Sequence, residues 1–406
     1  MRYERDPVDP FADSPRPNLA RKGRGAASNR AGRFEPGERP LEADGWDETS
    51  SGNEGESFTG LTFKGVALNL SPKPMPKGGD EDELPPLKTQ VALDTARSII
   101  SRNNSPDIPF DQSINPYRGC EHGCIYCYAR PTHAYLGHSP GLDFESRLYV
   151  KPEAAKLLEA ELRKPGYKPK VIAMGTNTDP YQPIERRYRI TRQILEVLNR
   201  FNHPAGITTK SANVLRDVDI LGDMARRNLV KVFISVTTLD RDLARTMEPR
   251  ASTPELRLKA IAGLHAAGIP VGVSVAPIIP ALTDMEIESI IERAAEAGAD
   301  SANFTLLRLP LEIKDLFVEW LEAHAPLKTK HVMDLVRDIH GGQIYNAEFH
   351  ERMQGSGAYA DLIRQRVQAA AKRFMMEPRY RFNVDCSQFK VPRLDSPQGD
   401  LFALPE

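Results

Sequence analysis

The chain is poor in cysteine, has no long apolar run and carries almost no net charge. Four cysteines in 406 residues are too few for a disulfide scaffold of this size. With no run of about 18 apolar residues we expect no membrane-spanning helix, and the first residues lack the apolar segment of a secretory signal. Lys and Arg total 54 against 55 Asp and Glu, which excludes a uniformly basic nucleic-acid coat. Length alone allows two or three domains, and we expect a cytoplasmic protein.

Residues 1–85 lack the apolar side chains that a core requires. Residues 1–58 contain only nine Val, Ile, Leu, Met, Phe, Trp and Tyr residues, too few to offset the entropy of ordering the chain. Charge is segregated, with nine bases and six acids in residues 1–40, then six acids and no base in residues 41–58. We predict that residues 1–85 are a mostly disordered arm and linker. The basic stretch 21–35 could bind a polyanion, or be solvated and bind nothing.

Residues 86–325 alternate short β-branched segments with amphipathic helical patterns. Six consecutive strand–helix units predict an α/β fold, because parallel strands need crossover connections. A doubly wound sheet and a barrel both fit, and in either the chemistry lies at the carboxyl ends of the strands. The expected strands are 111–117, 170–174, 205–209, 230–236, 269–277 and 301–307, and the expected helices are 152–163, 189–201, 215–227, 253–267, 283–297 and 311–322.

Residues 326–394 form a basic C-terminal extension with helical patterns at 330–339 and 358–374. Residues 364–393 carry eight bases and two acids, interleaved with Phe374, Tyr380, Phe382 and Phe389. Such a segment could bind nucleic acid. Its Lys and Arg side chains would contact phosphates, and its aromatic rings would stack on nucleobases. A solvated surface is the alternative. Residues 395–406 are expected to be a flexible tail.

Three of the four cysteines lie close together in the sequence. Cys120, Cys124 and Cys127 occur within eight residues, directly after the first expected strand. A structural zinc site needs four ligands, and His122 or Cys386 could supply the fourth. A ferredoxin-type cluster also needs four cysteines. Three thiolates leave one metal position open for a substrate or cofactor.

The pattern Cys-x3-Cys-x2-Cys, with Tyr126 before the third cysteine, resembles the signature of the radical S-adenosylmethionine (SAM) superfamily. The sequence NPYRGCEHGCIYCYAR at residues 115–130 is similar to the branch of spore photoproduct lyase and proteins named DNA repair photolyase. The resemblance implies a partial (βα)6 TIM-type barrel in which Cys120, Cys124 and Cys127 hold a 4Fe-4S cluster. It also implies that an external reductant supplies one electron, and that SAM is cleaved to a 5′-deoxyadenosyl radical that removes a hydrogen atom from the substrate.

The resemblance also suggests which residues bind SAM. Tyr128 would lie near the adenine, and Gly175 would permit close backbone approach after the second strand. Thr176 or Asp179 would bind the SAM amino group, and Lys210 would bind the carboxylate. Further candidates are Ser235 and Ala276 as SAM-lining residues, Asn303 and Arg308 as substrate contacts, and the loop histidines His133 and His138, for which a plain surface role is the alternative.

One departure concerns the hydrogen donor. Spore photoproduct lyases look to use a cysteine near the end of the second strand, where this chain has Met174-Gly175-Thr176. Repair of the spore photoproduct itself is therefore not expected. Cys386 or Tyr181 could replace that cysteine, and an inert buried thiol is the alternative for Cys386.

The predicted function is a radical SAM enzyme acting on nucleic acid in the manner of a DNA repair lyase. The alternatives are the same chemistry on a protein or small metabolite, and a non-catalytic zinc-binding nucleic-acid module. Near the end of the chain, Gln398, Leu401 and Phe402 resemble the peptide by which bacterial DNA enzymes dock on the sliding clamp.

Overall fold

A computed structural model of the chain describes residues 10–11, 23–34, 87–378 and 380–393. Its larger sheet has seven strands in the order β10-β9-β8-β7-β6-β3-β2. Six of them are parallel, and β2 pairs antiparallel with β3 at one edge. The strands are β2 (Ile100–Arg102), β3 (Gln112–Ile114), β6 (Ile172–Met174), β7 (Ala205–Thr209), β8 (Val230–Ser235), β9 (Val271–Ile278) and β10 (Ser301–Leu306).

The parallel strands follow one another across the sheet in chain order, from β3 to β10. A doubly wound fold would reverse its strand order partway, so that alternative is wrong. Because parallel crossovers share one hand, a sheet without reversal carries its crossover helices on one face. In the described residues the edge strands β2 and β10 are not paired with each other, so the sheet is open.

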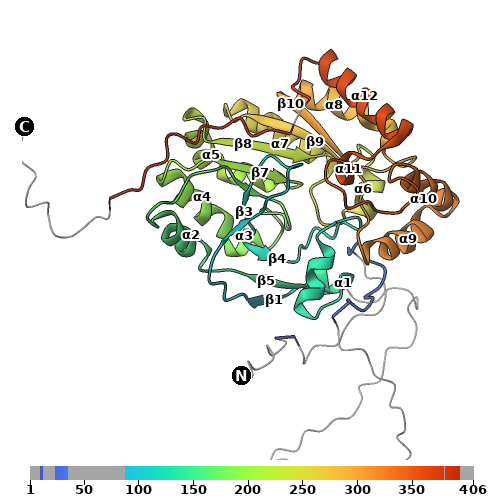
Figure 1. Cartoon of the computed structure of the whole chain (residues 1–406), viewed down its shortest axis with the longest axis horizontal. Helices are drawn as coiled ribbons and strands as arrows, with labels where there is room; N and C mark the ends of the chain where they lie inside the picture. The colour runs from blue at the N-terminus through green and yellow to red at the C-terminus, as the bar shows by residue number, and fades with distance from the viewer. Residues whose placement is uncertain (1–9, 12–22, 35–86, 379, 394–406) are drawn as a thin grey trace, which may run out of the picture. The chain divides into compact units, whose positions relative to one another are not determined.

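The predicted helices are present with small shifts at their ends. Thr253, for example, caps α7 by accepting a bond from the Leu256 amide, with Pro254 at the first helical position. The helices, labelled in Figure 1, are α1 (Leu142–Ser146), α2 (Ala154–Leu162), α3 (Glu185–Tyr188), α4 (Ile190–Arg200), α5 (Val218–Arg226), α6 (Arg241–Met247), α7 (Pro254–Ala266), α8 (Ile287–Glu296), α9 (Ile313–His324), α10 (Thr329–Asp338), α11 (Glu351–Gln354) and α12 (Gly357–Arg373).

The two faces of the larger sheet differ in composition. Alternate strand residues such as Ile207, Val232 and Val273 join the main core together with the crossover helices. The residues between them point to the opposite face. We call this opposite face the small-residue face, because it carries Ala173, Gly206, Thr208, Gly272 and Ser274 in addition to Phe233.

A second sheet was not anticipated from the sequence. Its three short strands, β1 (Gln90–Leu93), β5 (Arg147–Val150) and β4 (Tyr117–Arg118), pair in the order β1-β5-β4. Strands of two to four residues are too short to give a periodic hydrophobic signal. This sheet matters for the site because β4 leads directly into Cys120.

Part of the predicted disordered arm is ordered. Residues 23–34 pack against the folded chain, where the Gly25 and Ala26 amides donate to Glu145 at 2.8 and 2.9 Å. Asn29 and Asp143 exchange two hydrogen bonds. The prediction was wrong here because it counted apolar side chains, whereas this segment is held by polar groups. The rest of the arm, apart from residues 10–11, lies outside the described residues.

The aromatic residues of the C-terminal extension are mostly in contact with protein. Phe382 is buried against Phe233 on the small-residue face, and its ring occupies the space that a Cβ at Gly206 would need. Phe389 packs against Phe201, Tyr167 and His203. Phe382 is therefore used in packing, and Phe389 is partly used in packing, while nucleic-acid binding by this segment stays a prediction.

Two predictions concern the ends of the chain and its relation to membranes. Gln398, Leu401 and Phe402 lie outside the described residues, so sliding-clamp docking stays a prediction. Among the described residues, every helix is too short or too polar to cross a membrane.

Candidate functional site

The segment 118–128, here called the cysteine loop, begins in β4 and is fixed by backbone hydrogen bonds on several sides. The Cys120 amide donates to the Phe144 carbonyl at 2.9 Å, and the Ile125 amide donates to the Met247 carbonyl at 3.0 Å. The His122 carbonyl accepts from the Arg250 amide at 3.2 Å. The loop is therefore held between α1 and the segment that follows α6, beside the carboxyl ends of the strands.

The three cysteines of the loop are shielded from solvent. Cys120 and Cys124 are buried and Cys127 is partly buried. Burial raises the pKa of all three thiols. Repulsion from the other thiols adds to this for two of them: Cys124 and Cys127 raise the pKa of Cys120, and Cys127 raises the pKa of Cys124. Lys210 acts in the opposite direction on Cys124 and Cys127. The loop thus brings three thiols within electrostatic range of one another and of one buried ammonium.

This donor set suits a group that is wider than a single ion. In the described part of the chain, no three His, Cys, Asp or Glu side chains converge on one metal ion. An iron–sulfur cluster binds each thiolate through a different iron, so its ligand sulfurs lie further apart than the sulfurs around one zinc. Three soft donors on one short buried loop fit an iron–sulfur cluster.

Lys210 follows β7 and points toward the cysteine loop. Its ammonium donates to the Ala276 carbonyl at 2.9 Å and to Thr237 at 3.2 Å, and it lies 5.5 Å from the centre of the Tyr126 ring. Glu248 lies 3.3 Å away. Burial lowers the pKa of Lys210 to about 8. A buried ammonium at the strand ends is suited to pair with a carboxylate ligand.

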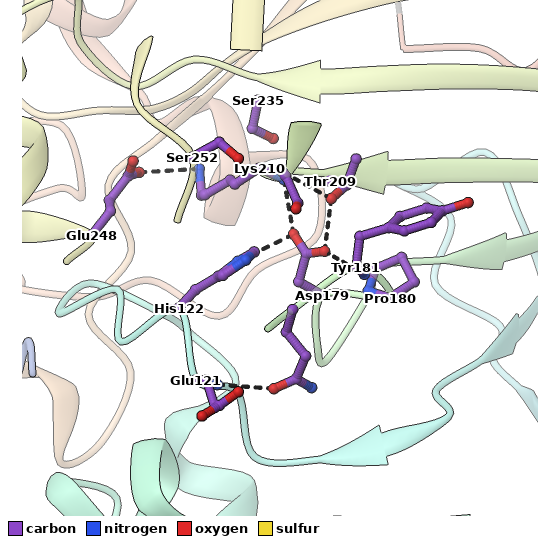
Figure 2. A network of polar contacts seen from close by, with 12 residues as sticks. Glu121, His122, Asp179, Pro180, Tyr181, Thr209, Lys210, Ser235, Glu248 and Ser252 are labelled. Atoms are coloured by element: carbon purple, nitrogen blue, oxygen red, sulfur yellow. Dashed lines mark hydrogen bonds and ion pairs between the residues drawn. The ribbon is translucent and has the colours of Figure 1, made fainter. Parts of the chain in front are cut away.

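Asp179 is the centre of the polar network in Figure 2. Its carboxylate accepts hydrogen bonds from the Lys210 amide at 2.8 Å and from the Thr209 hydroxyl at 2.7 Å. The Tyr181 amide donates at 2.8 Å, and His122 Nδ1 lies 3.4 Å away. These contacts hold the pKa of Asp179 below its usual range. Four donors already face this carboxylate. Through its hydrogen bonds, Asp179 connects the loop after β6 to the end of β7.

The other residues predicted after the second strand have identifiable neighbours. Gly175 adopts a positive φ of 93°, and a Cβ there would lie 1.9 Å from the Thr208 carbonyl oxygen, so glycine is needed for the close approach of β7. The Thr176 carbonyl accepts a bond from the Tyr128 hydroxyl, and its own hydroxyl donates to Asn115 at 3.2 Å. Thr176 therefore lies against Tyr128, the last residue of the cysteine loop.

The remaining candidates at the strand ends are Ser235, Ala276, Asn303 and Arg308. Ala276 and Ser235 present backbone carbonyls to buried cations, the first to Lys210 and the second to Arg257 at 3.1 Å. The Arg308 guanidinium lies 4.3 Å from the centre of the Tyr128 ring, which is 44% exposed. Asn303 accepts a hydrogen bond from Ser274 at 2.9 Å on the small-residue face.

Other candidates lie elsewhere in the fold. Cys386 is next to Val171, before the start of β6, and so at the opposite end of that strand from Gly175. Tyr181 belongs to the main core with the helices. Neither placement suits a hydrogen donor at the strand ends. His133 and His138 are buried beneath the second sheet, bonded to the Arg147 carbonyl and the Tyr149 hydroxyl. These histidines are neither surface residues nor part of the Asp179–Lys210 network.

Several residues of the site were missed in the sequence. Glu248 accepts from Thr237 at 2.7 Å and pairs with Arg257 inside the protein. The buried ion pair Arg130–Glu145 contacts the cysteine loop, where Arg130 donates to backbone carbonyls. Charged residues within helical or loop patterns look like ordinary surface, so only the folded chain brings them together. The small-residue face did have a signal, because β7 and β9 alternate Gly, Ser and Thr with Val and Ile.

Comparison with known proteins agrees with this geometry. The family model described as the radical SAM superfamily matches residues 114–294. The uncharacterized protein Rv2578c of Mycobacterium tuberculosis (strain ATCC 25618 / H37Rv) is 38% identical over 231 residues, which cover 56% of this chain and 68% of that protein. The uncharacterized protein MJ0683 of Methanocaldococcus jannaschii is 31% identical over 173 residues, which cover 43% and 62%.

Solved structures of spore photoproduct lyase share the fold. The structure complexed with dinucleoside spore photoproduct has a TM-score of 0.52 at 16% identity and covers 71% of this chain and 82% of that one. A double mutant of the lyase with bound AdoMet and dinucleoside spore photoproduct also gives 0.52 at 16% identity, covering 72% and 82%. With its three-cysteine loop at the strand ends, this chain belongs to the radical SAM superfamily.

Proposed function

We propose that this chain is a radical SAM enzyme that holds a 4Fe-4S cluster through Cys120, Cys124 and Cys127 and acts on a nucleic-acid substrate. The observation that carries the proposal is the set of three shielded thiols beside Lys210 at the carboxyl ends of the strands. With an external one-electron reductant, the bound cluster and SAM would together supply a 5′-deoxyadenosyl radical. We further propose that the open sheet curves as a partial (βα)6 barrel.

In this proposal the residues around the thiols bind and orient SAM. The Lys210 ammonium pairs with the SAM carboxylate, and Asp179 holds the Lys210 backbone in place through its amide. Thr176 and the carbonyls at Ala276 and Ser235 offer polar groups at neighbouring strand ends. The surrounding protein excludes water and competing partners.

The fold likeness supports nucleic acid as the substrate class, since several of the similar spore photoproduct lyase structures hold a dinucleoside. Arg308, stacked on the partly exposed ring of Tyr128, provides a cation and an aromatic surface of the kind that binds phosphates and bases. The spore photoproduct itself is not proposed as the substrate, because this chain has Met174-Gly175-Thr176, without a cysteine, at the end of β6. A protein or small metabolite remains the alternative substrate class.

Anaerobic reconstitution tests the cluster and the chemistry. We expect about four irons per chain and reductant-dependent release of 5′-deoxyadenosine from SAM. The triple variant C120A/C124A/C127A should lose both. C386A is the matched control and should keep both, because Cys386 lies beside Val171 before β6. A triple variant that still released 5′-deoxyadenosine would refute the assignment.

Two further measurements separate SAM binding from substrate class. Lys210→Met should raise the KM for SAM by about tenfold or more while leaving the iron content unchanged, because it removes a charge-assisted hydrogen bond. Adding single-stranded DNA or RNA should stimulate SAM cleavage. Stimulation by a protein or metabolite fraction and none by either nucleic acid would favour the alternative substrate class.

A further inference from the structure

The ordered part of the N-terminal arm, residues 23–34, crosses the cysteine loop, and we call it the strap. It approaches the loop tightly at Gly25, where an added Cβ would lie 1.7 Å from the Gly123 carbonyl oxygen. Gly123 stands between Cys120 and Cys124. Ala26 packs in the same apolar cluster as Cys124, Ile125 and Tyr126. The strap is therefore in direct contact with the backbone that carries two of the three thiols.

A buried ion pair joins the strap to the loop. Glu145 and Arg130 are both fully buried and paired. Arg130 donates to the Gly123 carbonyl at 3.1 Å and to the Cys124 carbonyl at 2.9 Å. The Glu145 carboxylate in turn accepts the amides of Gly25 and Ala26 at 2.8 and 2.9 Å. Without the strap these carboxylate oxygens would lose two donors, which is costly for a buried charge.

Arg24 extends the same connection to the start of the loop. Its guanidinium donates to the Glu145 carbonyl, to the Leu87 carbonyl at 2.7 Å and to Thr89 at 2.9 Å. Thr89 donates to Glu121, the residue after Cys120. Arg24 thus connects the strap to α1 through the Glu145 carbonyl. It also connects the strap, through Thr89, to Glu121 beside Cys120.

The far end of the strap is fastened to α1 and α9. Asn29 and Asp143 exchange hydrogen bonds of 3.1 and 3.0 Å, and Ser28 donates to Glu319 at 2.7 Å. Arg30 lies 3.4 Å from Asp315, and Arg33 lies 2.8 Å from Glu312. These contacts come from chain positions far apart, so the strap has a defined seat on the folded domain.

We propose that the strap positions the cysteine loop and slows the loss of the cluster that the loop holds. The inference rests on the proposed cluster binding, and it assigns Arg24, Gly25, Arg130 and Glu145 as positioning residues. Strap docking and cluster binding then favour each other, since both require the same arrangement of the loop.

The test uses the full chain with the substitution Gly25→Ala, whose methyl group meets the Gly123 carbonyl. We expect the reconstituted variant to release iron to a chelator about tenfold faster than the unsubstituted protein. The reason is that it would lose about two hydrogen bonds, those from the Gly25 and Ala26 amides to Glu145. Its iron–sulfur absorbance should decay in parallel. The control is Gly222→Ala in α5, where a Cβ meets only the Ala267 carbonyl at 3.9 Å, and its release rate should be unchanged.

Hydrogen exchange shows whether the strap has detached. We expect the amides of residues 24–34 to exchange faster in Gly25→Ala than in the unsubstituted protein, while the amides of β7 and β8 stay protected. In the unsubstituted protein these strap amides should exchange more slowly with the cluster than without it. If Gly25→Ala unfolds the whole domain, the double variant R24A/N29A, which adds no atoms, is measured in its place with the same expected result.

Two outcomes overturn the inference and can be told apart. A variant with a detached strap and unchanged iron release refutes the strap proposal alone. An unsubstituted chain that takes up no iron–sulfur cluster refutes the proposed function, and the strap inference with it.

Discussion

The strap at residues 23–34 and the C-terminal segment at residues 380–393 each carry more basic than acidic residues, but they attach to the protein in different ways. The strap is held mainly by polar groups, such as the amides that donate to Glu145. The C-terminal segment is held mainly by rings, such as Phe382 on Phe233 and Phe389 on Phe201. The strap lies on the cysteine loop, whereas the C-terminal segment meets the residues that precede β7 and β8.

The strap shows that arginines in a basic segment can serve contacts within the chain. Arg30 and Arg33 of the strap pair with carboxylates of α9 and the residue before it. In the C-terminal segment the Asp385 and Lys390 amides bond to the carbonyls of Asn228 and Phe201. Both segments therefore make contacts with the rest of the folded chain. The comparison predicts that breaking the strap affects the cluster, while breaking the C-terminal segment affects stability alone.

The largest effect is expected for Phe382→Ala. The ring is 3% exposed and fills the space over Gly206, so its removal should lower the free energy of unfolding by about 3–5 kcal/mol. Urea unfolding measures this loss. Iron release after reconstitution should stay at the unsubstituted rate at a temperature where the variant is folded. A loss below about 1 kcal/mol, or rapid iron release, would contradict the division between the two segments.

A smaller effect is expected from His203, which packs against Phe389 of the C-terminal segment. Burial lowers its pKa to about 4 from an ordinary value of 6.5. Above pH 6.5 the group is neutral in both states. Below pH 6.5 the unfolded chain takes up the proton first, so the free energy of unfolding falls as the pH drops toward 4.

Urea unfolding at about pH 7.5 and about pH 5 measures that dependence. The unsubstituted protein should lose about 2 kcal/mol more than His203→Gln over this interval, because one pKa unit corresponds to about 1.4 kcal/mol. Equal losses in the two proteins would show that His203 does not titrate differently on folding.

The smallest effect is expected for Arg30→Ala in the strap. The Arg30 side chain is 45% exposed in its ion pairs with Asp315 and Glu319, so its loss should lower the free energy of unfolding by about 0–1 kcal/mol. The difference should shrink when ionic strength rises from about 0.1 M to about 1 M. A salt-independent loss above about 2 kcal/mol would mean that Arg30 does more than pair at the surface.

The sequence predicted the parallel strands and crossover helices well because each has a hydrophobic period of its own. It also located the three thiols and Lys210 at the strand ends. It could not predict that Glu145, Arg130 and Gly25 meet, because these residues lie in separate segments without periodicity. Nor could it distinguish a polar strap from a disordered arm, since the acceptors of Gly25 and Ala26 lie some 120 positions further along.

The docking site of the strap has a consequence for how the protein is made on the ribosome. Arg30 and its partner Glu319 are separated by 289 positions, so the strap is synthesised early but its full seat appears only after α9 has left the ribosome. Contacts between such distant positions form late, because a long loop must close first. Before α9 emerges, the strap can be held only by partners such as Glu145, which accepts the Gly25 and Ala26 amides and is synthesised much earlier. The interval between the emergence of Glu145 and the emergence of α9 is then a period in which the strap covers the cysteine loop but lacks its attachment to α9.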